Sequence, residues 1–205
     1  MRGLLRKDLY MIGKYGKTLL AMSLIFLITG LFGDGDNFFL VVYPVLFAGV
    51  LPVTLISYEE RFGWDRYCGV LPLTRRTVVS ARYLTSLLSF LALYALTLLL
   101  RAAVDLPRGE VHELRELAAL LPAFGLLAPS VMLPLTLRFG VEKARIAYYV
   151  LIGVVVAMGI FLFNSSADLG GEIGGVGAAL VPAVTLLLFA GSWLLSIRLY
   201  EKREL

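Results

Sequence analysis

The sequence predicts an all-α integral membrane protein that crosses the bilayer six times. Of its 205 residues 59% are apolar and 17% are charged, whereas a soluble domain is about 45–50% apolar and about 25% charged. Six stretches free of Asp, Glu, Lys and Arg follow one another along the chain. Each reaches or approaches the roughly 17–25 residues that a membrane-spanning helix needs. The mean hydropathy of +0.84 agrees with this fold class.

The segment before the first span has the pattern of a short amphipathic helix. Leu5, Leu9 and Ile12 recur at positions i, i+4 and i+7, and basic residues occupy other positions around the axis. Such a helix can lie along the inner headgroups of a bilayer. A simple positively charged anchor is an equally open interpretation.

The expected spans lie at about residues 18–33, 37–58, 83–100, 117–137, 146–163 and 173–197. They account for most of residues 1–205, so we expect a single transmembrane domain. Separate catalytic or ATPase domains rarely fall much below 100 residues, and the chain has no room for one. The first span is not a cleavable signal peptide, because it lacks a small-x-small cleavage site and leads directly into another apolar run.

The distribution of Lys and Arg predicts the orientation. Alternate connecting segments carry 16 of these residues on one side and 3 on the other. Because Lys and Arg concentrate in cytoplasmic segments, we expect both termini in the cytoplasm. The basic balance needs no nucleic acid to explain it, since anionic lipid headgroups suffice.

No ionisable residue occurs inside the six apolar cores. Such residues usually mark ion paths or proton relays in carriers, so energy for any uphill transport is expected from another subunit. This chain is not expected to bind the nucleotide itself. Gly16-Lys17-Thr18 resembles the end of a phosphate-binding loop, but the pattern requires glycine where Met11 stands and a strand before it.

Neither catalytic residues nor a metal site are expected. The chain has one cysteine, Cys68, and one histidine, His112. The single cysteine excludes an internal disulfide, and the two residues together offer little for a metal ion. His112 lies among glutamates, which we interpret as a solvated acidic segment.

The largest inner loop, residues 59–82, is the most distinctive part of the sequence because aromatic and charged residues alternate closely in it. Trp64 and Tyr67 are three residues apart and would share one face of a helix. Pro72 interrupts this helix, and Thr74 is placed to cap a second helix that starts at Arg75. Aromatic residues and arginine are favoured at protein interfaces, so the loop indicates a docking surface. The alternative is an aromatic belt at the membrane surface.

The segment from Glu59 to Tyr83 resembles the first cytoplasmic loop of the small six-span ABC-2 type transporter permeases of bacteria. That family has an acidic pair followed by Gly-Trp-Asp-Arg/Lys-Tyr, by Leu-Pro-Leu/Val-Thr/Ser-Arg and by a small residue before Arg/Lys-Tyr. The corresponding segments are Gly63–Tyr67, Leu71–Arg75 and Ala81–Tyr83. The opening segment Gly3–Tyr10 also resembles the start of the family, and length and span number match along the whole chain.

The resemblance implies the transmembrane subunit of an ATP-driven exporter in the bacterial plasma membrane. Two such subunits, identical or paired with a related permease, would join two separate ABC ATPase subunits that bind ATP and Mg. This chain would then be no enzyme, would hold no cofactor, and would contact membrane lipid but no nucleic acid. The residues implied to couple it to the ATPase are Glu59, Glu60, Phe62, Trp64, Asp65, Arg66, Tyr67, Pro72, Arg75 and Arg76. Trp64 and Tyr67 would be the apolar anchors of a cytoplasmic coupling helix between spans two and three.

Two other functions stay open from the sequence: a secondary carrier or channel, and a non-transporting membrane protein that protects the cell by sequestering a peptide. The lack of a charged pocket disfavours small ions and sugars as substrates. Amphipathic peptides, including antimicrobial ones, or lipid-like molecules fit better. The sequence does not define the substrate, the direction of transport, the pathway residues or the choice between homodimer and heterodimer.

Overall fold

The computed structural model describes residues 2–32, 38–64, 74–108, 111–147, 149–150 and 175–201. Within these ranges the regular structure is helical and contains no strand, so the predicted all-α class is confirmed. The helices are α1 (Arg2–Tyr15), α2 (Lys17–Phe32), α3 (Phe38–Arg61), α5 (Arg75–Arg108), α6 (Val111–Phe139) and α8 (Gly175–Glu201). Residues 141–147 add a further helical segment.

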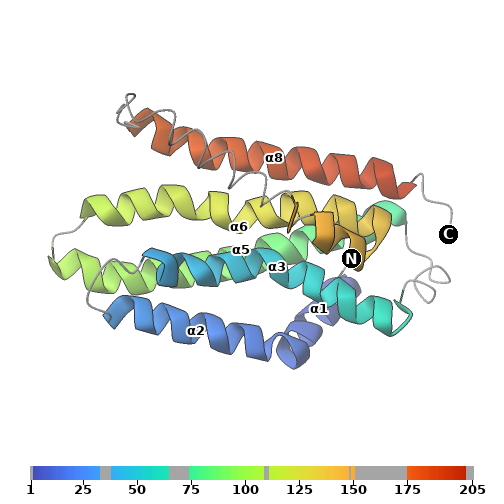
Figure 1. Cartoon of the computed structure of the whole chain (residues 1–205), viewed down its shortest axis with the longest axis horizontal. Helices are drawn as coiled ribbons and strands as arrows, with labels where there is room; N and C mark the ends of the chain where they lie inside the picture. The colour runs from blue at the N-terminus through green and yellow to red at the C-terminus, as the bar shows by residue number, and fades with distance from the viewer. Residues whose placement is uncertain are drawn as a thin grey trace.

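The long helices lie side by side with α8 on α6, α6 on α3 and α5, and α2 on α3 (Figure 1). The short helix α1 meets α2 at an angle of 67°. Both ends of the described chain lie toward the end of the bundle where α3 ends and α5 begins (Figure 1). We call this the loop end of the bundle.

Among the described residues, four helices are long and apolar enough to cross a membrane, and the bent pair of α1 and α2 is a candidate for a fifth crossing. The expected spans 37–58, 117–137 and 173–197 correspond to α3, α6 and α8. The expected span 18–33 corresponds to α2, whose 16 residues are short for a crossing. The expected span 146–163 lies outside the described residues except at its beginning. The total of six crossings and the cytoplasmic location of both termini therefore stay predictions.

The third expected span is longer than the apolar run 83–100 indicated. Helix α5 has 34 residues, about 51 Å at 1.5 Å per residue, against a hydrocarbon core of about 30 Å. It extends beyond the run at both ends because charged side chains are accommodated within it. Arg82 is paired with carboxylates from other helices, and Arg101 lies 3.3 Å from Asp105 one turn further along.

Helices α3, α5 and α6 approach closely at two glycines. A Cβ atom on Gly49 would lie 2.5 Å from the carbonyl oxygen of Gly125. A Cβ atom on Gly125 would lie 2.4 Å from the ring of Phe90 and 2.7 Å from Val45. Only glycine permits this separation, so the two positions fix how α6 packs on α3 and α5.

The outward faces of the helices are apolar as well. Leu187 on α8, Ile25 on α2 and Leu99 on α5 are among the large apolar side chains exposed on the chain. Exposed apolar patches of this extent are rare on soluble monomers, and they suit helices whose outer faces contact lipid.

Candidate functional site

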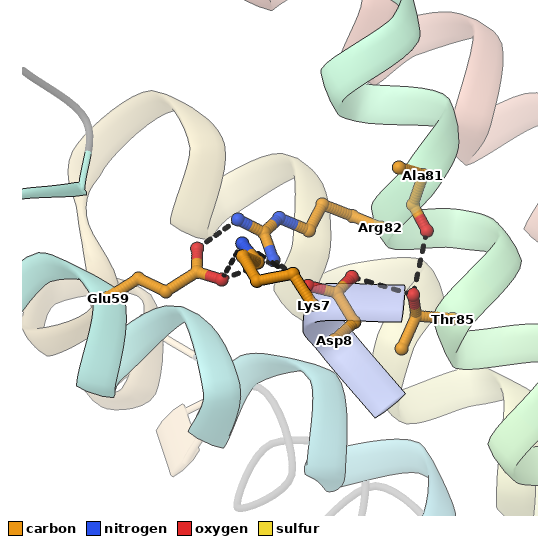
Figure 2. Close-up of polar contacts among 6 residues, drawn as sticks. All are labelled: Lys7, Asp8, Glu59, Ala81, Arg82 and Thr85. Atoms are coloured by element: carbon orange, nitrogen blue, oxygen red, sulfur yellow. Dashed lines mark hydrogen bonds and ion pairs between the residues drawn. The ribbon is translucent and has the colours of Figure 1, made fainter. Parts of the chain in front are cut away.

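Five polar residues from three helices converge at the loop end of the bundle. Helix α1 contributes Lys7 and Asp8, α3 contributes Glu59, and α5 contributes Arg82 and Thr85, as Figure 2 shows. We call this group the Glu59 cluster. Glu59 is near the end of α3 and Arg82 is two turns into α5, so the cluster lies where the two helices that flank the inner loop meet.

Arg82 is the centre of the cluster (Figure 2). Its Nη1 donates to Oε1 of Glu59 at 2.8 Å and to Oδ1 of Asp8 at 3.1 Å, and its Nη2 donates to Oε2 of Glu59. The guanidinium therefore binds the Glu59 carboxylate through both of its terminal nitrogens. This bidentate geometry is the strong form of an Arg–carboxylate pair.

Asp8 is bound from α5 at both of its oxygens. Oδ1 accepts from Arg82, and Oδ2 lies 2.8 Å from the hydroxyl of Thr85. The same hydroxyl lies 2.9 Å from the carbonyl oxygen of Ala81, so its proton is shared between two acceptors. The exposed fraction is 1% for Asp8, 4% for Glu59 and 6% for Arg82.

Lys7 balances the charge of the cluster. Its ammonium group donates to Oε1 of Glu59, lies 3.3 Å from Oδ1 of Asp8, and lies 4.2 Å from the centroid of a Trp64 ring. Two cations thus face two carboxylates, and the group is formally neutral. Buried charges are tolerated when they are paired and hydrogen-bonded in this way, whereas removal of one partner is costly.

Glu60 contacts a different part of the chain from its neighbour Glu59. The backbone N–H of Val141 donates to Oε1 and Oε2 of Glu60 at 3.2 and 3.4 Å. Val141 begins the helical segment 141–147, so the carboxylate satisfies a free N–H at the start of a helix and lies near the positive end of its dipole. The acidic pair therefore joins the end of α3 to three other segments.

Tyr83 follows Arg82 but points to the opposite side of α5. Its hydroxyl lies 2.8 Å from Ser192 Oγ and 2.7 Å from Ser196 Oγ on α8, and its ring stacks on Trp193 with centroids 5.6 Å apart. The Ser192 hydroxyl donates to the carbonyl oxygen of Ser130 on α6. Adjacent residues of α5 thus connect α1 and α3 on one side with α6 and α8 on the other.

The beginning of α5 has the cap that the sequence predicts. The backbone N–H of Thr77 donates to the side-chain oxygen of Thr74 at 3.3 Å, and α5 begins at Arg75. Arg75 donates to the carbonyl oxygen of Tyr200 at 3.3 Å. This places a cation at the last turn of α8, where free carbonyls and the helix dipole favour positive charge.

The sequence-predicted coupling residues occupy different environments. Phe62 is 70% exposed, and Glu60 at the end of α3 and Arg76 at the start of α5 are exposed as well. Glu59 is buried, and Trp64 packs against Leu4, Val78 and Ala81 rather than projecting fully outward. Asp65, Arg66, Tyr67 and Pro72 lie outside the described residues.

Lys7, Asp8 and Arg82 were absent from the residues that the sequence assigned to the site. One signal was available: Asp8 is the only acidic residue before position 34 in a segment rich in Lys and Arg. Arg82 belongs to the Ala81–Tyr83 motif, but its proximity to apolar residues suggested only a span boundary. The structure explains all three motif positions, since Ala81 packs on Leu4, Arg82 enters the Glu59 cluster and Tyr83 reaches α8.

The Glu59 cluster joins α1, α3 and α5 through paired charges and hydrogen bonds. Among the residues that the structure describes, no three His, Cys, Asp or Glu side chains gather as metal ligands. The cluster lies where α3 and α5 flank the inner loop, and it holds the amphipathic helix α1 against both of them.

Apolar helices of spanning length, with exposed apolar faces and a charged loop end, define an integral membrane protein. Residues 3–201 match the family model described as ABC-2 family transporter protein, and the chain belongs to this family. Comparison with curated proteins gives no significant match, and neither does comparison with solved structures. Membership makes the chain a membrane transport subunit, not itself catalytic, and implies association with an ABC ATPase subunit.

Proposed function

We propose that this chain is the permease subunit of an ATP-driven exporter in the bacterial plasma membrane. Two copies, or one copy and a related permease, work with two ABC ATPase subunits that bind ATP and Mg. Both termini and the inner loop face the cytoplasm in this proposal. The positive-inside distribution of Lys and Arg supports that orientation.

The Glu59 cluster is the observation that carries the proposal. A loop that receives force from a partner can move the membrane helices only if its base is firmly attached to them. Here the Arg82–Glu59 pair joins the two helices that flank the loop, and Asp8 joins α1 to the same point. Movement of the loop is thereby transmitted to α1, α3 and α5 together.

The contact surface for the ATPase centres on the exposed part of the loop. Phe62 presents an apolar ring at the end of α3, the neighbouring Arg61 is exposed, and Arg76 is exposed at the start of α5. Asp65, Arg66, Tyr67 and Pro72 complete the proposed surface. Glu59 and Trp64 support it from beneath, since both pack against α1.

Amphipathic peptides or lipid-like molecules are the proposed substrates. The described faces of the bundle that would meet lipid or a second subunit are apolar, as Leu187, Leu194 and Ile25 illustrate. Such faces suit a cargo that moves along or between apolar surfaces better than they suit a small ion.

Co-purification with the partner ABC ATPase subunit tests the proposal. Phe62→Ala should weaken capture of the ATPase at least tenfold, because truncation of a central aromatic anchor typically costs about 2 kcal/mol or more. Leu187→Ala is the matched control, since it also truncates an exposed apolar residue but lies on α8. Equal capture by both variants would refute the docking surface.

Reconstitution into vesicles tests the energy source. With the ATPase present, ATP should drive release of labelled amphipathic peptides from the cytoplasmic side. Without the ATPase the chain should be inert. Gradient-driven flux through the chain alone would contradict the exporter and favour a secondary carrier.

A further inference from the structure

A cavity of about 280 Å³ lies between α1, α2, α3 and α5. Leu5, Leu9 and Ile12 of α1 form one side of it, so the apolar face of this helix does not pack completely against the bundle. Most of the remaining wall is aliphatic: Leu20, Leu51, Leu88, Ala92, Leu93 and Leu96. Leu9 and Leu88 are each about half exposed, which places them where the cavity opens to the surroundings.

The polar residues of the wall have their hydroxyls engaged within the protein. Thr85 Oγ1 is hydrogen-bonded to Asp8 and to the carbonyl oxygen of Ala81. Ser89 Oγ donates to the carbonyl oxygens of Thr85 and Ser86, each at 2.9 Å. A polar ligand would therefore lose its hydrogen bonds to water without replacement, which is costly. The cavity selects a hydrocarbon.

The charge on α1 and α2, two of the helices that form the cavity, indicates which hydrocarbon occupies it. Arg6, Lys14 and Lys17 are exposed on α1 and at the start of α2, and the only acidic residue of these two helices, Asp8, is buried in the Glu59 cluster. Basic residues on an amphipathic helix attract anionic lipid headgroups. We propose that one acyl chain of an anionic phospholipid occupies the cavity, with its headgroup held by these cations.

The bound chain lies next to the Glu59 cluster, since Thr85 belongs to both. It fills the space under α1 and supports the position from which Asp8 reaches Arg82. The proposal concerns a resident lipid and depends only on the chain being in a membrane, so failure of the exporter proposal leaves it unaffected.

Native mass spectrometry of the detergent-purified chain tests the proposal with dioleoyl-phosphatidylglycerol and dioleoyl-phosphatidylcholine. The wild type should bind one phosphatidylglycerol at least tenfold more tightly than phosphatidylcholine. Ala92→Phe places a ring in the cavity wall and should weaken this binding at least tenfold. Ala95→Phe is the matched control, because Ala95 is an exposed residue of α5 outside the wall. Equal binding by the two variants would overturn the cavity as the site.

The wild type alone gives an independent measurement. Dihexanoyl-phosphatidylglycerol carries the same headgroup on short chains and should bind at least tenfold more weakly than the dioleoyl lipid. Equal binding of the two would show that the headgroup alone is recognised and would refute an acyl-chain site.

The headgroup half of the proposal is tested by the triple change Arg6→Gln, Lys14→Gln and Lys17→Gln. This variant should retain a lipid chain but lose the preference for phosphatidylglycerol. An unchanged preference would refute the assignment of these cations. Occupation of the site by a second copy of the chain would instead appear as a dimer that Ala92→Phe dissociates, and that result also would overturn the proposal.

Discussion

Arg82 shows how much of the structure can depend on one side chain. It is 6% exposed and donates to two carboxylates from two other helices. A buried ion network contributes little stability relative to an apolar replacement, yet loss of one member leaves an uncompensated charge behind. The coupling of Arg82 to its partners is therefore measured by comparing the free energy of unfolding when Arg82 is replaced alone and when it is replaced together with a partner.

Arg82→Gln should lower the free energy of unfolding by about 3–5 kcal/mol, because Asp8 and Glu59 would then share only Lys7 as a cation. The double change Arg82→Gln with Glu59→Gln should cost less than the sum of the two single changes. Denaturation in nanodiscs measures both quantities. Arg198→Gln, an exposed arginine at the loop end, is the control and should change stability little. Additive losses would contradict the coupling.

Asp8 and Asp105 are equally buried, at 1% exposed each, but differ in their hydrogen bonding. Both oxygens of Asp8 have donors on α5, whereas neither oxygen of Asp105 has a hydrogen-bond partner in the described structure. Asp8→Asn should cost about 3 kcal/mol or more, as it unbalances the network. Asp105→Asn should cost about 1 kcal/mol or less, because Asp105 has a single i,i+4 ion pair, whose partner Arg101 is partly exposed and stays hydrated after the change. Thermal unfolding of the two variants side by side tests the contrast, and equal losses would disprove it.

At the scale of the helices, close packing depends on small residues as well as on polar contacts. Gly49 of α3 faces the backbone of α6, and backbone atoms cannot rotate away as a side chain can. Gly191 in α8 has nothing within 4 Å of an added Cβ atom. The two glycines therefore allow a controlled comparison, because both lie within long apolar helices but only Gly49 is in close contact with another helix.

Gly49→Ala should destabilise the protein by about 1–3 kcal/mol through overpacking between α3 and α6. Gly191→Ala should be neutral or stabilising by up to about 1 kcal/mol, because alanine is the better helix former. Apparent melting temperatures in the same detergent distinguish the two outcomes. A harmless Gly49→Ala would mean that the helices separate more easily than their contact implies.

The sequence predicted the helices wherever the signal was local. Apolar runs predicted α3, α6 and α8. Thr74, whose side chain caps the helix, predicted the start of α5. The length of α5 could not be predicted in this way. A charged residue such as Arg82 indicates the end of an apolar span unless its ion-pair partners are known. Those partners lie 23 and 74 residues away in the chain, and no local pattern records such a distance.

For the candidate site, the sequence indicates which loop is distinctive but not how its residues divide between the surface and the interior. The aromatic and charged pattern identified the 59–82 loop as distinctive, and Phe62 is indeed exposed there. The pattern did not separate residues that face outward from residues that anchor the loop. Glu59 and Glu60 are neighbours of identical type, yet one enters a buried cluster and the other caps residues 141–147.

Over the whole molecule, α5 connects the two halves of the bundle. Arg82 joins it to α1 and α3, and Tyr83 joins it to α8, where Ser192 continues the connection to α6. Displacement of the loop by a bound ATPase should therefore reach both halves through α5. Of Arg82 and Tyr83, only Arg82 contacts α1, and Thr85 adds a second hydrogen bond from α5 to Asp8.

Hydrogen exchange of the complex with its ATPase measures this transmission without a known substrate. When a non-hydrolysable ATP analogue binds the partner, amide exchange in the wild type should change at least threefold both in α5 and in α1. In Arg82→Gln the change in α5 should persist, because Tyr83 and the packing of α3 on α5 are retained. The change in α1 should become smaller, because Asp8 loses its guanidinium partner and keeps only the Thr85 hydroxyl on α5. Comparison at a temperature where the variant is fully folded separates transmission from stability, and an α1 response equal to that of the wild type would exclude the Glu59 cluster as the connection.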